Sequence, residues 1–221
     1  MGPTLSLDQQ IRIIPPFTAK EIKDAIFSIP NEKSPGADGF SSGFFKKSLN
    51  HLGTMVINAI QEFFKIGKML KRCNITNLVL LPKVNNPESA NDFRPISCYN
   101  VVYKGISKLL SNGLKEVLPE LVNQSQRTFI KRRELLFNVL VCQEITKGYN
   151  RQAISPKCMM KIDLKKAYDS IHWDFMVELM DKLRFPKEFT KWIKTCITTT
   201  SFSLQLNGSV VGYFQWGRGL G

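Results

Sequence analysis

The chain has 221 residues, 43% hydrophobic and 22% charged, a composition typical of a globular protein with one large domain or two small lobes. Lys and Arg number 31 against 18 Asp and Glu, and the net charge of +13 favours a polyanionic partner such as nucleic acid over other roles for a basic protein. The five cysteines form no Cys-x-x-Cys pair, which excludes a ribbon-type zinc site and argues against a secreted disulfide scaffold.

No apolar run approaches the roughly 20 residues that span a bilayer. The first ten residues also lack the basic start and apolar stretch of a signal peptide. Gly2 and Ser6 fit a loose myristoylation pattern, which we attribute to chance because Pro3 follows and no second anchoring signal is present. The sequence therefore predicts an intracellular protein, nuclear or cytoplasmic, with no membrane partner.

The N-terminal part of the chain is predicted to be helix-rich. Thr18 and Glu21 form the capping box of a helix that continues to Pro30, supported by apolar residues at helical spacing. The stretch 31–40, NEKSPGADGF, is typical of a tight exposed turn. Apolar side chains recurring on one face then predict one long helix over 42–66.

The middle of the chain begins with a predicted buried strand over 75–81, a run of β-branched and leucine residues. The polar segment NNPESANDFRP is predicted to be a loop that ends at Arg94 and Pro95. Two helices come next, over 101–117, where Pro119 closes the helix, and over 134–147.

The C-terminal part is predicted to build a sheet. Its expected elements are a short strand over 158–163, helices over 173–186 and 187–198, and strands over 202–206 and 210–214 joined by Asn207-Gly208. The predicted fold class is mixed α/β.

Two aspartates near residue 163 raise the question of a metal site. Asp163 ends an apolar run, where a carboxylate can bind a hard cation. Nucleotidyl transfer typically uses two Mg²⁺ ions about 4 Å apart, so a single carboxylate is insufficient. Spacing alone leaves Asp163 open between a metal ligand and a helix-capping or loop acid, and favours capping for Asp169.

Lys83 and Arg94 flank one loop and form a second candidate site. Two such cations can bind a triphosphate, with the arginine contacting two oxygens. The alternatives are a solvated lysine and an arginine paired with Asp92.

The stretch QRTFIKRRE forms a third candidate site. Its basic residues suit contact with a phosphate backbone, and a solvated helix start is the alternative. They are Arg127, Lys131, Arg132 and Arg133. No Walker loop, Gly-x-Ser-x-Gly elbow or His-Glu-x-x-His motif occurs, so those enzyme classes receive no support.

In consecutive order, five blocks of this sequence resemble the reverse transcriptase of non-LTR (LINE-type) retrotransposons, most closely the plant kind. They are PFTAKEIKDAIFSIPNEKSPGADGF, LVLLPK, NDFRPISCYNVVYKGISKLL, KIDLKKAYDSIHWDFM and LNGSVVGYFQWGRGLG. The resemblance implies an α/β (α+β) right-hand polymerase, with an N-terminal extension and fingers over 1–155 and an incomplete palm over 156–221.

The block KIDLKKAYDS resembles motif A of that family, which implies roles for three residues. Asp163 would be the catalytic metal ligand, the Leu164 carbonyl would help to hold Mg²⁺, and Tyr168 would be the steric gate under the sugar. Lys83 and Arg94 match the positions that contact the incoming triphosphate. The implied reaction is attack of a primer 3′-hydroxyl on the α-phosphate of a dNTP, with RNA as template and pyrophosphate leaving.

The sequence also departs from the family pattern. RGLG over 218–221 resembles the start of motif B with a glycine in place of its second arginine, and the 221 residues contain no Tyr-x-Asp-Asp. Arg127, Thr128 and Arg132 replace small residues of the family. We therefore expect a reverse transcriptase fragment from a degenerate or partial copy, inactive alone and of undetermined oligomeric state. The alternatives are a non-catalytic nucleic-acid-binding module and a product that does not fold stably because its sheet is open.

Overall fold

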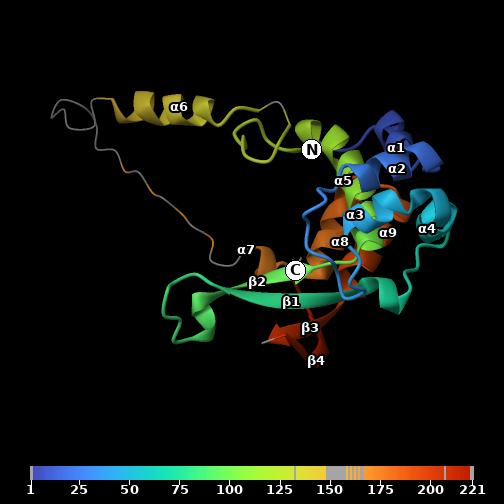
Figure 1. Cartoon of the computed structure of the whole chain (residues 1–221). Helices are drawn as coiled ribbons and strands as arrows, with labels where there is room; N and C mark the ends of the chain where they lie inside the picture. Colours follow the sequence, from blue (N-terminus) through green and yellow to red (C-terminus); the bar gives the residue numbers. More distant parts are fainter. Residues whose placement is uncertain are drawn as a thin grey trace.

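The computed structural model describes residues 2–131, 133–147, 158, 160, 162, 164, 167–206 and 208–219. A cluster of helices lies beside one mixed sheet (Figure 1), which confirms the predicted α/β class. The helices are α1 (Leu7–Ile13), α2 (Ala19–Phe27), α3 (Ser42–Lys47), α4 (Leu49–Ile66), α5 (Val101–Leu121), α6 (Leu136–Thr146), α7 (Ala167–Ser170), α8 (Trp173–Lys182) and α9 (Lys187–Thr198). Short 3-10 turns, η1 (Lys71–Asn74) and η2 (Ala90–Asp92), precede the first two strands.

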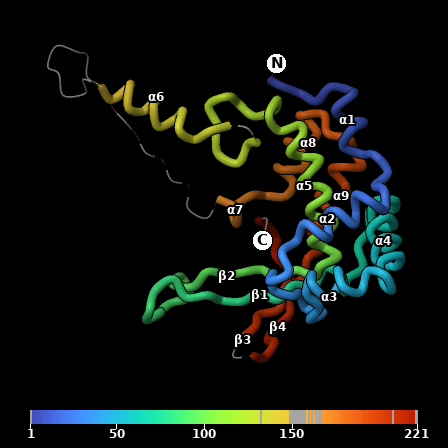
Figure 2. Tube along the Cα trace, turned by 45° about the horizontal axis from the view of Figure 1, so that its top comes forward, coloured from blue at the N-terminus to red at the C-terminus, as the bar shows by residue number. Residues whose placement is uncertain are grey.

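The sheet has the strand order β2-β1-β3-β4. Its strands are β1 (Ile75–Pro82), β2 (Phe93–Cys98), β3 (Ser201–Leu206) and β4 (Ser209–Gln215). β1 and β2 form an antiparallel hairpin, β3 and β4 form another, and β1 pairs with β3 in parallel, with Thr76 opposite Phe202. Figures 1 and 2 both show the β1–β2 hairpin extending away from the helices. The sheet therefore joins strands from both sides of residue 155.

The predicted C-terminal hairpin is confirmed. Its strands pair with Leu206 opposite Ser209, and Gly208 between them has φ +81°. A positive φ at this turn position is the conformation that glycine adopts most readily. Asn207, the other residue of the predicted turn, lies outside the described residues.

The hydrophobic core lies among helices from the two ends of the chain. α5 packs against α1, α2 and α4, and α8 packs against α9. Phe189 of α9 is fully buried in the same cluster as Ile13, Ile26 and Ile60. The N-terminal helices and residues 173–198 are therefore stabilised by one shared core.

The end of α4 is held by α9. Trp192 Nε1 donates to the Phe64 carbonyl at 3.0 Å, and Lys191 Nζ donates to the Ile66 carbonyl at 2.8 Å. Thr195 Oγ1 donates to the Gly67 carbonyl at 3.0 Å. Carbonyls at a helix C-terminus have no partner within the helix, so these three bonds satisfy groups that would otherwise need water.

The predicted capping box at Thr18 is confirmed. Thr18 Oγ1 accepts from the Glu21 amide at 3.2 Å, and a Glu21 carboxylate oxygen accepts from the Thr18 amide at 2.8 Å. Hydrogen bonds from the Thr18 hydroxyl, and then from the Thr18 amide, lower the pKa of the Glu21 carboxyl. A second box, Ser6 with Gln9, begins α1, a helix that the periodicity argument missed.

The predicted helix over 42–66 is wrong in its continuity. Ser48 has φ −91° and ψ 3°, and it ends α3 and precedes α4. Phe40 and Phe44 stack with ring centroids 4.6 Å apart, and Phe45 packs edge-on against Phe44 at 5.7 Å. This aromatic cluster gives α3 partners of its own, so the two segments do not need to share one axis.

Two further predictions that rested on proline are wrong. α5 continues through Pro119 to Leu121, although Pro119 has no N–H to donate to the carbonyl four residues earlier, and the helix ends two residues after it. The predicted loop NNPESANDFRP is also too long, because the strand β2 already begins at Phe93 and includes Pro95. β2 is an edge strand, so Pro95 does not interrupt a ladder on both sides.

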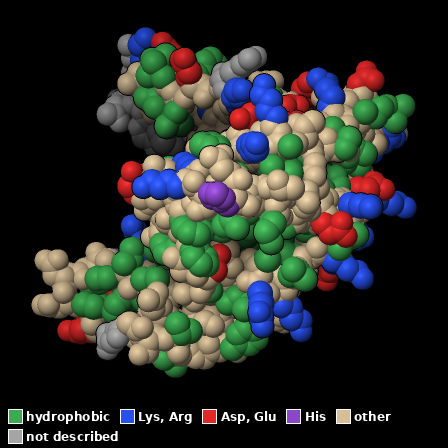
Figure 3. Space-filling model, turned by 45° about the vertical axis from the view of Figure 1, so that its right-hand side comes forward, with side chains coloured by type: hydrophobic (Ala, Val, Ile, Leu, Met, Phe, Trp, Pro, Cys, Tyr) green, Lys and Arg blue, Asp and Glu red, His purple; other side chains and the backbone are tan. Residues whose placement is uncertain are grey.

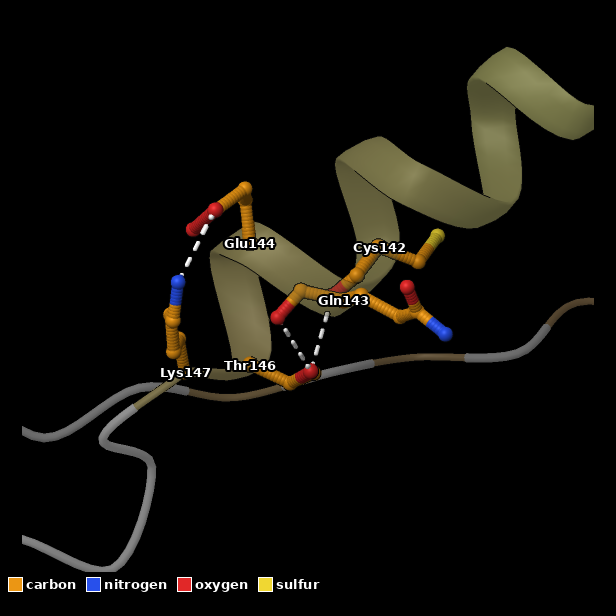
Figure 4. Close-up of polar contacts among 5 residues, drawn as sticks. All are labelled: Cys142, Gln143, Glu144, Thr146 and Lys147. Atoms are coloured by element: carbon orange, nitrogen blue, oxygen red, sulfur yellow. Dashed lines mark hydrogen bonds and ion pairs between the residues drawn. The ribbon is translucent and has the colours of Figure 1, made fainter.

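α6 lies apart from the helical core in Figures 1 and 2. Its end is closed by local contacts: Thr146 Oγ1 donates to the Cys142 carbonyl at 2.8 Å, and Lys147 Nζ lies 3.1 Å from a Glu144 carboxylate oxygen (Figure 4). None of its residues is buried. No helix in the described part of the chain is long and apolar enough to cross a membrane.

Replacing the buried ring at the centre of the core tests this packing. We expect Phe189→Ala to lower the free energy of unfolding by about 3–5 kcal/mol, because it removes a fully buried aromatic side chain. Phe129→Ala, at a ring that is 85% exposed, is the matched control and should change it by less than about 0.5 kcal/mol. Urea titration followed by circular dichroism measures both, and equal losses would contradict the shared core.

Candidate nucleotide and nucleic-acid site

The far end of the β1–β2 hairpin carries two exposed cations. Arg94 is paired with Leu81 across the hairpin, and the Lys83 amide donates to the Asp92 carbonyl at 2.7 Å, which continues the ladder. Paired residues, and residues two apart on one strand, point to the same face, so Lys83 and Arg94 share a face. Diagonal neighbours of this kind are roughly 7–8 Å apart. Both charges can therefore contact one polyphosphate.

Asp92 is not the partner of Arg94. Its carboxylate accepts from the Ser89 amide at 2.8 Å and from the Glu88 amide at 3.1 Å. The hydrogen bonds from Ser89 are the main reason that the pKa of Asp92 is lowered, and the charge of Lys83 contributes least. Among the residues that the structure describes, the single ion pair is Lys147–Glu144, so the Arg94–Asp92 alternative is not found.

The described members of the basic run after α5 have different surroundings, and Arg133 contacts the main chain. The Arg133 guanidinium donates to the carbonyls of Pro119, Val122, Asn123 and Gln126 at 2.5–2.9 Å. It closes the C-terminus of α5 and the turn that follows, a structural role that the sequence analysis did not foresee.

The other members of the run have different surroundings. The Arg127 guanidinium carbon lies 4.3 Å from the centre of the Phe137 ring, a cation–π contact that links it to α6. Lys131 is exposed. Arg132 lies outside the described residues. Among the three described members of the run, Lys131 is the side chain whose surroundings match a solvated cation.

Asp163, the central residue of the motif A block, lies outside the described residues. Of the predicted strand over 158–163, the described residues Cys158, Met160 and Ile162 have no regular structure. Leu164 is 74% exposed and Tyr168, in α7, is 63% exposed. Both are therefore accessible to a ligand.

The capping role predicted for Asp169 is wrong. Asp169 lies within α7, and the residue that precedes α8 is His172, whose side chain makes no capping bond. The turn between α7 and α8 instead forms hydrogen bonds with Gly219, near the C-terminal end of the described residues.

That contact brings the RGLG segment against the end of the motif A block. The Gly219 amide donates to the Ile171 carbonyl at 2.8 Å, and Trp173 Nε1 donates to the Gly219 carbonyl at 2.6 Å. Gly219 has φ +90°, and a Cβ at this position would lie 3.0 Å from the Asp169 main chain. A glycine is required here because both the conformation and the close approach disfavour a side chain.

Asn100 is a positioning residue that the sequence analysis missed. Its Oδ1 accepts from the Asp38 amide at 3.2 Å, and its Nδ2 donates to the Arg72 carbonyl at 3.1 Å. A Cβ on Gly36 would lie 2.1 Å from Asn100 Oδ1. Asn100 therefore links the 34–39 loop and η1 to the start of α5 by hydrogen bonds. Gly36 in SPGADG is the residue of this loop whose type is a sequence signal of the close approach.

In residues 2–131, 133–147 and the described part beyond them, no three His, Cys, Asp or Glu side chains gather into a possible metal cluster. Asp163 lies outside these described residues. Its single carboxylate would not be enough for a site that holds two metal ions.

The role of Arg133 can be separated from phosphate binding. We expect Arg133→Ala to lower the free energy of unfolding by about 1–3 kcal/mol, because several main-chain carbonyls lose a charged donor. Lys131→Ala, two residues away and exposed, should cost less than about 0.5 kcal/mol. Thermal and urea unfolding measure both, and an unchanged stability of the Arg133 variant would contradict the capping role.

Residues 81–218 match the family model of reverse transcriptase (RNA-dependent DNA polymerase). A "Transposon TX1 uncharacterized 149 kDa protein" of Xenopus laevis is 27% identical over 99% of this chain and 17% of its own length. A "Probable RNA-directed DNA polymerase from transposon BS" of Drosophila melanogaster is 26% identical over 89% of this chain and 22% of its own length. The chain thus spans about a fifth of each relative, and these animal sequences do not test the resemblance to plant elements.

The family match covers well over half of the chain and includes Lys83, Arg94 and the motif A block, whereas most of β1 precedes it and Gly219 follows it. The predicted resemblance to transposon polymerases is confirmed, with an α/β structure that suits part of the fingers and palm. The chain belongs to the reverse transcriptase family, as a domain of the non-LTR retrotransposon type.

Proposed function

We propose that this domain binds the triphosphate of a dNTP and serves RNA-templated nucleotidyl transfer to a primer 3′-hydroxyl. The observation that carries the proposal is the shared face of Lys83 and Arg94 on the β1–β2 hairpin, within the part of the chain that matches the family. Nucleic-acid and nucleotide partners follow from the family, and RNA as template and DNA as primer are part of the proposal.

The two cations have complementary tasks. Arg94 presents a planar fork that can contact two oxygens of one phosphate, whereas Lys83 supplies a compact charge. Lys83 Nζ donates to the Asn91 carbonyl at 2.7 Å, so its ammonium group is already directed along the loop side of the hairpin. A triphosphate would replace water around both groups without first breaking an ion pair.

The motif A residues act on the other end of the nucleotide. The exposed ring of Tyr168 would pack beneath the sugar and disfavour a 2′-hydroxyl. Asp163 and the Leu164 carbonyl would hold a divalent ion, which this family generally uses, and Mg²⁺ is the ion that we propose. The chemistry that such an ion would supply there is stabilisation of negative charge on the phosphate oxygens.

The domain boundaries belong to the same proposal. Residues 1–155 would supply the N-terminal extension and fingers, and 156–221 the first part of the palm. The acids that complete a two-ion site would come from a Tyr-x-Asp-Asp segment, which these 221 residues do not contain. The chain alone is therefore proposed to bind substrates without polymerising them.

Removal of the two hairpin cations tests triphosphate binding. We expect the double variant Lys83→Gln/Arg94→Gln to weaken dTTP binding by at least about tenfold, because each hydrogen bond to a charged group contributes roughly 1.5–3 kcal/mol. Isothermal titration calorimetry measures the change. Lys71→Gln/Arg72→Gln removes the same charge at the opposite end of β1 and is the control. Equal effects of the two double variants would overturn the assignment.

A primer-extension assay tests the proposed inactivity of the 221 residues alone. With poly(rA)/oligo(dT), dTTP and Mg²⁺, incorporation should not exceed background, because one carboxylate cannot support two ions and groups acting as a unit fail together. Incorporation that Asp163→Ala abolishes would refute the proposal.

A non-catalytic nucleic-acid-binding module is the second candidate, favoured by the net charge of +13. On the face drawn in Figure 3, Lys and Arg side chains occur around the rim with acidic side chains among them, rather than in one continuous basic patch. This candidate predicts RNA binding that weakens steeply with salt and is unchanged by Asp163→Asn.

A further inference from the structure

A cleft of about 480 Å³ opens between the end of α2 and the first turns of α5. One side is a stripe of α5 formed by Lys104, Ser107, Lys108 and Ser111. These residues recur at the i, i+3, i+4, i+7 spacing of one helix face, whereas Ile106, Leu109 and Leu110 face the core. α5 therefore has one face for folding and a second, basic and hydroxyl-bearing face that the core does not use.

The other side of the cleft adds a third lysine and an aromatic ring. Lys33 comes from the turn after α2, and Tyr99 lies between β2 and α5. The Tyr99 ring is stacked on Tyr103, with centroids 4.3 Å apart and an interplanar angle of 10°. No Asp or Glu is among the described residues that line this cleft. The cleft therefore combines three lysines, three serines and two tyrosines with the apolar side chains of Ile29 and Pro30.

The position of Lys104 in the cleft disfavours its charged form. Burial lowers the pKa of Lys104 and is the largest effect on it; the positive charge of Lys33 acts in the same direction, and Cys98 and Asp38 oppose both. Neither lysine forms an ion pair with a residue that the structure describes. An anion in the cleft would offset the burial and the repulsion, because an opposite charge nearby favours the charged form of a lysine.

The wall of the cleft is held in place before any ligand binds. Ser42 Oγ donates to the Pro30 carbonyl at 2.6 Å, and Lys46 Nζ donates to the Ile29 carbonyl at 2.5 Å. Lys104 Nζ donates to the Ser34 carbonyl at 2.6 Å, across the mouth of the turn. Because this wall is already ordered, ligand binding loses less conformational entropy.

We infer that this cleft binds the sugar–phosphate backbone of a single nucleic-acid strand, with Lys33 and Lys108 on the phosphates and the apolar wall beside the sugar or base. Lysine and serine are ordinary donors to phosphate oxygens, and an aromatic wall accepts any base. The volume is that of a small-ligand pocket, which suits one strand rather than a double helix.

The cleft is also connected to the proposed nucleotide site. Tyr99 follows the last residue of β2, and Arg94 lies four residues before that residue in the same strand. At about 3.3 Å per residue, this separation is roughly 13 Å along the strand. A strand lying in the cleft would thus run toward the base of the hairpin that carries Lys83 and Arg94. The choice of partner rests on the proposed function, which the inference deepens.

Fluorescence anisotropy with a labelled single-stranded oligouridylate and the 221-residue chain tests the inference. Lys33→Gln/Lys108→Gln should weaken binding about 20-fold at roughly 0.1 M salt and reduce the slope of log K against log [salt] by about 1.4, since each phosphate contact on a single strand contributes about 0.7. The matched control is Lys20→Gln/Lys115→Gln, which removes the same charge from exposed positions of α2 and α5 outside the cleft. It should leave the slope within about 0.3 of the wild-type value.

Thermal unfolding of both double variants excludes loss of folding as the cause. Equal slopes for the two double variants, with wild-type binding intact, would overturn the cleft and leave the proposed function standing. A wild-type chain that binds no oligouridylate would overturn both. Displacement of the label by inorganic triphosphate at concentrations equal to those of the oligonucleotide phosphates would identify a free polyphosphate as the ligand and overturn the assignment to a strand.

Discussion

The contact between α9 and the end of α4 determines how the two halves of the chain are joined. Three donors from α9 satisfy the last carbonyls of α4, and Trp192 packs edge-on against Phe64 with ring centroids 4.9 Å apart. The two helices therefore end in the same region, and each is followed closely by a strand. Asn74 Nδ2 donates to Thr199 Oγ1 at 2.7 Å, and Thr200 Oγ1 donates to Asn74 Oδ1 at 3.0 Å, so the chain enters β1 and β3 side by side. Their parallel pairing follows from this shared starting point.

A parallel pair that is separated by more than 100 residues is costly in loop-closure entropy, and the core must offset that cost. Burial of Phe189 and its neighbours supplies the driving force, while the polar contacts at Asn74 determine the register. This anchoring also determines where Lys83 and Arg94 lie. β1 is anchored at its first residues, so the hairpin that extends from it carries Lys83 and Arg94 away from the helices, toward open solvent (Figure 1).

α5 connects this hairpin to the rest of the molecule. Two residues separate it from β2, its apolar face enters the core, and Asn100 at its start holds both η1 and the 34–39 loop. The helix thus fixes the positions of the hairpin and of the basic cleft on its other face relative to the core. The single strand that we place in that cleft and the nucleotide that we place on the hairpin would be oriented by one rigid element.

Local features of this protein were predictable from residues close together in the chain. The Thr18 capping box, the extent of β1 and α9, and the turn at Gly208 follow from side-chain chemistry within a few residues. The family blocks identified Lys83 and Arg94 as a pair, and their register supports one shared face.

Features that depend on distant partners were missed: the strand at Pro95 requires an edge position in a sheet, and the carbonyl contacts of Arg133 require the end of α5 to lie beside it. The parallel alignment of β1 with β3 belongs to the same class, because no local pattern specifies a partner more than 100 residues away, and only the docking of α9 on α4 selects it.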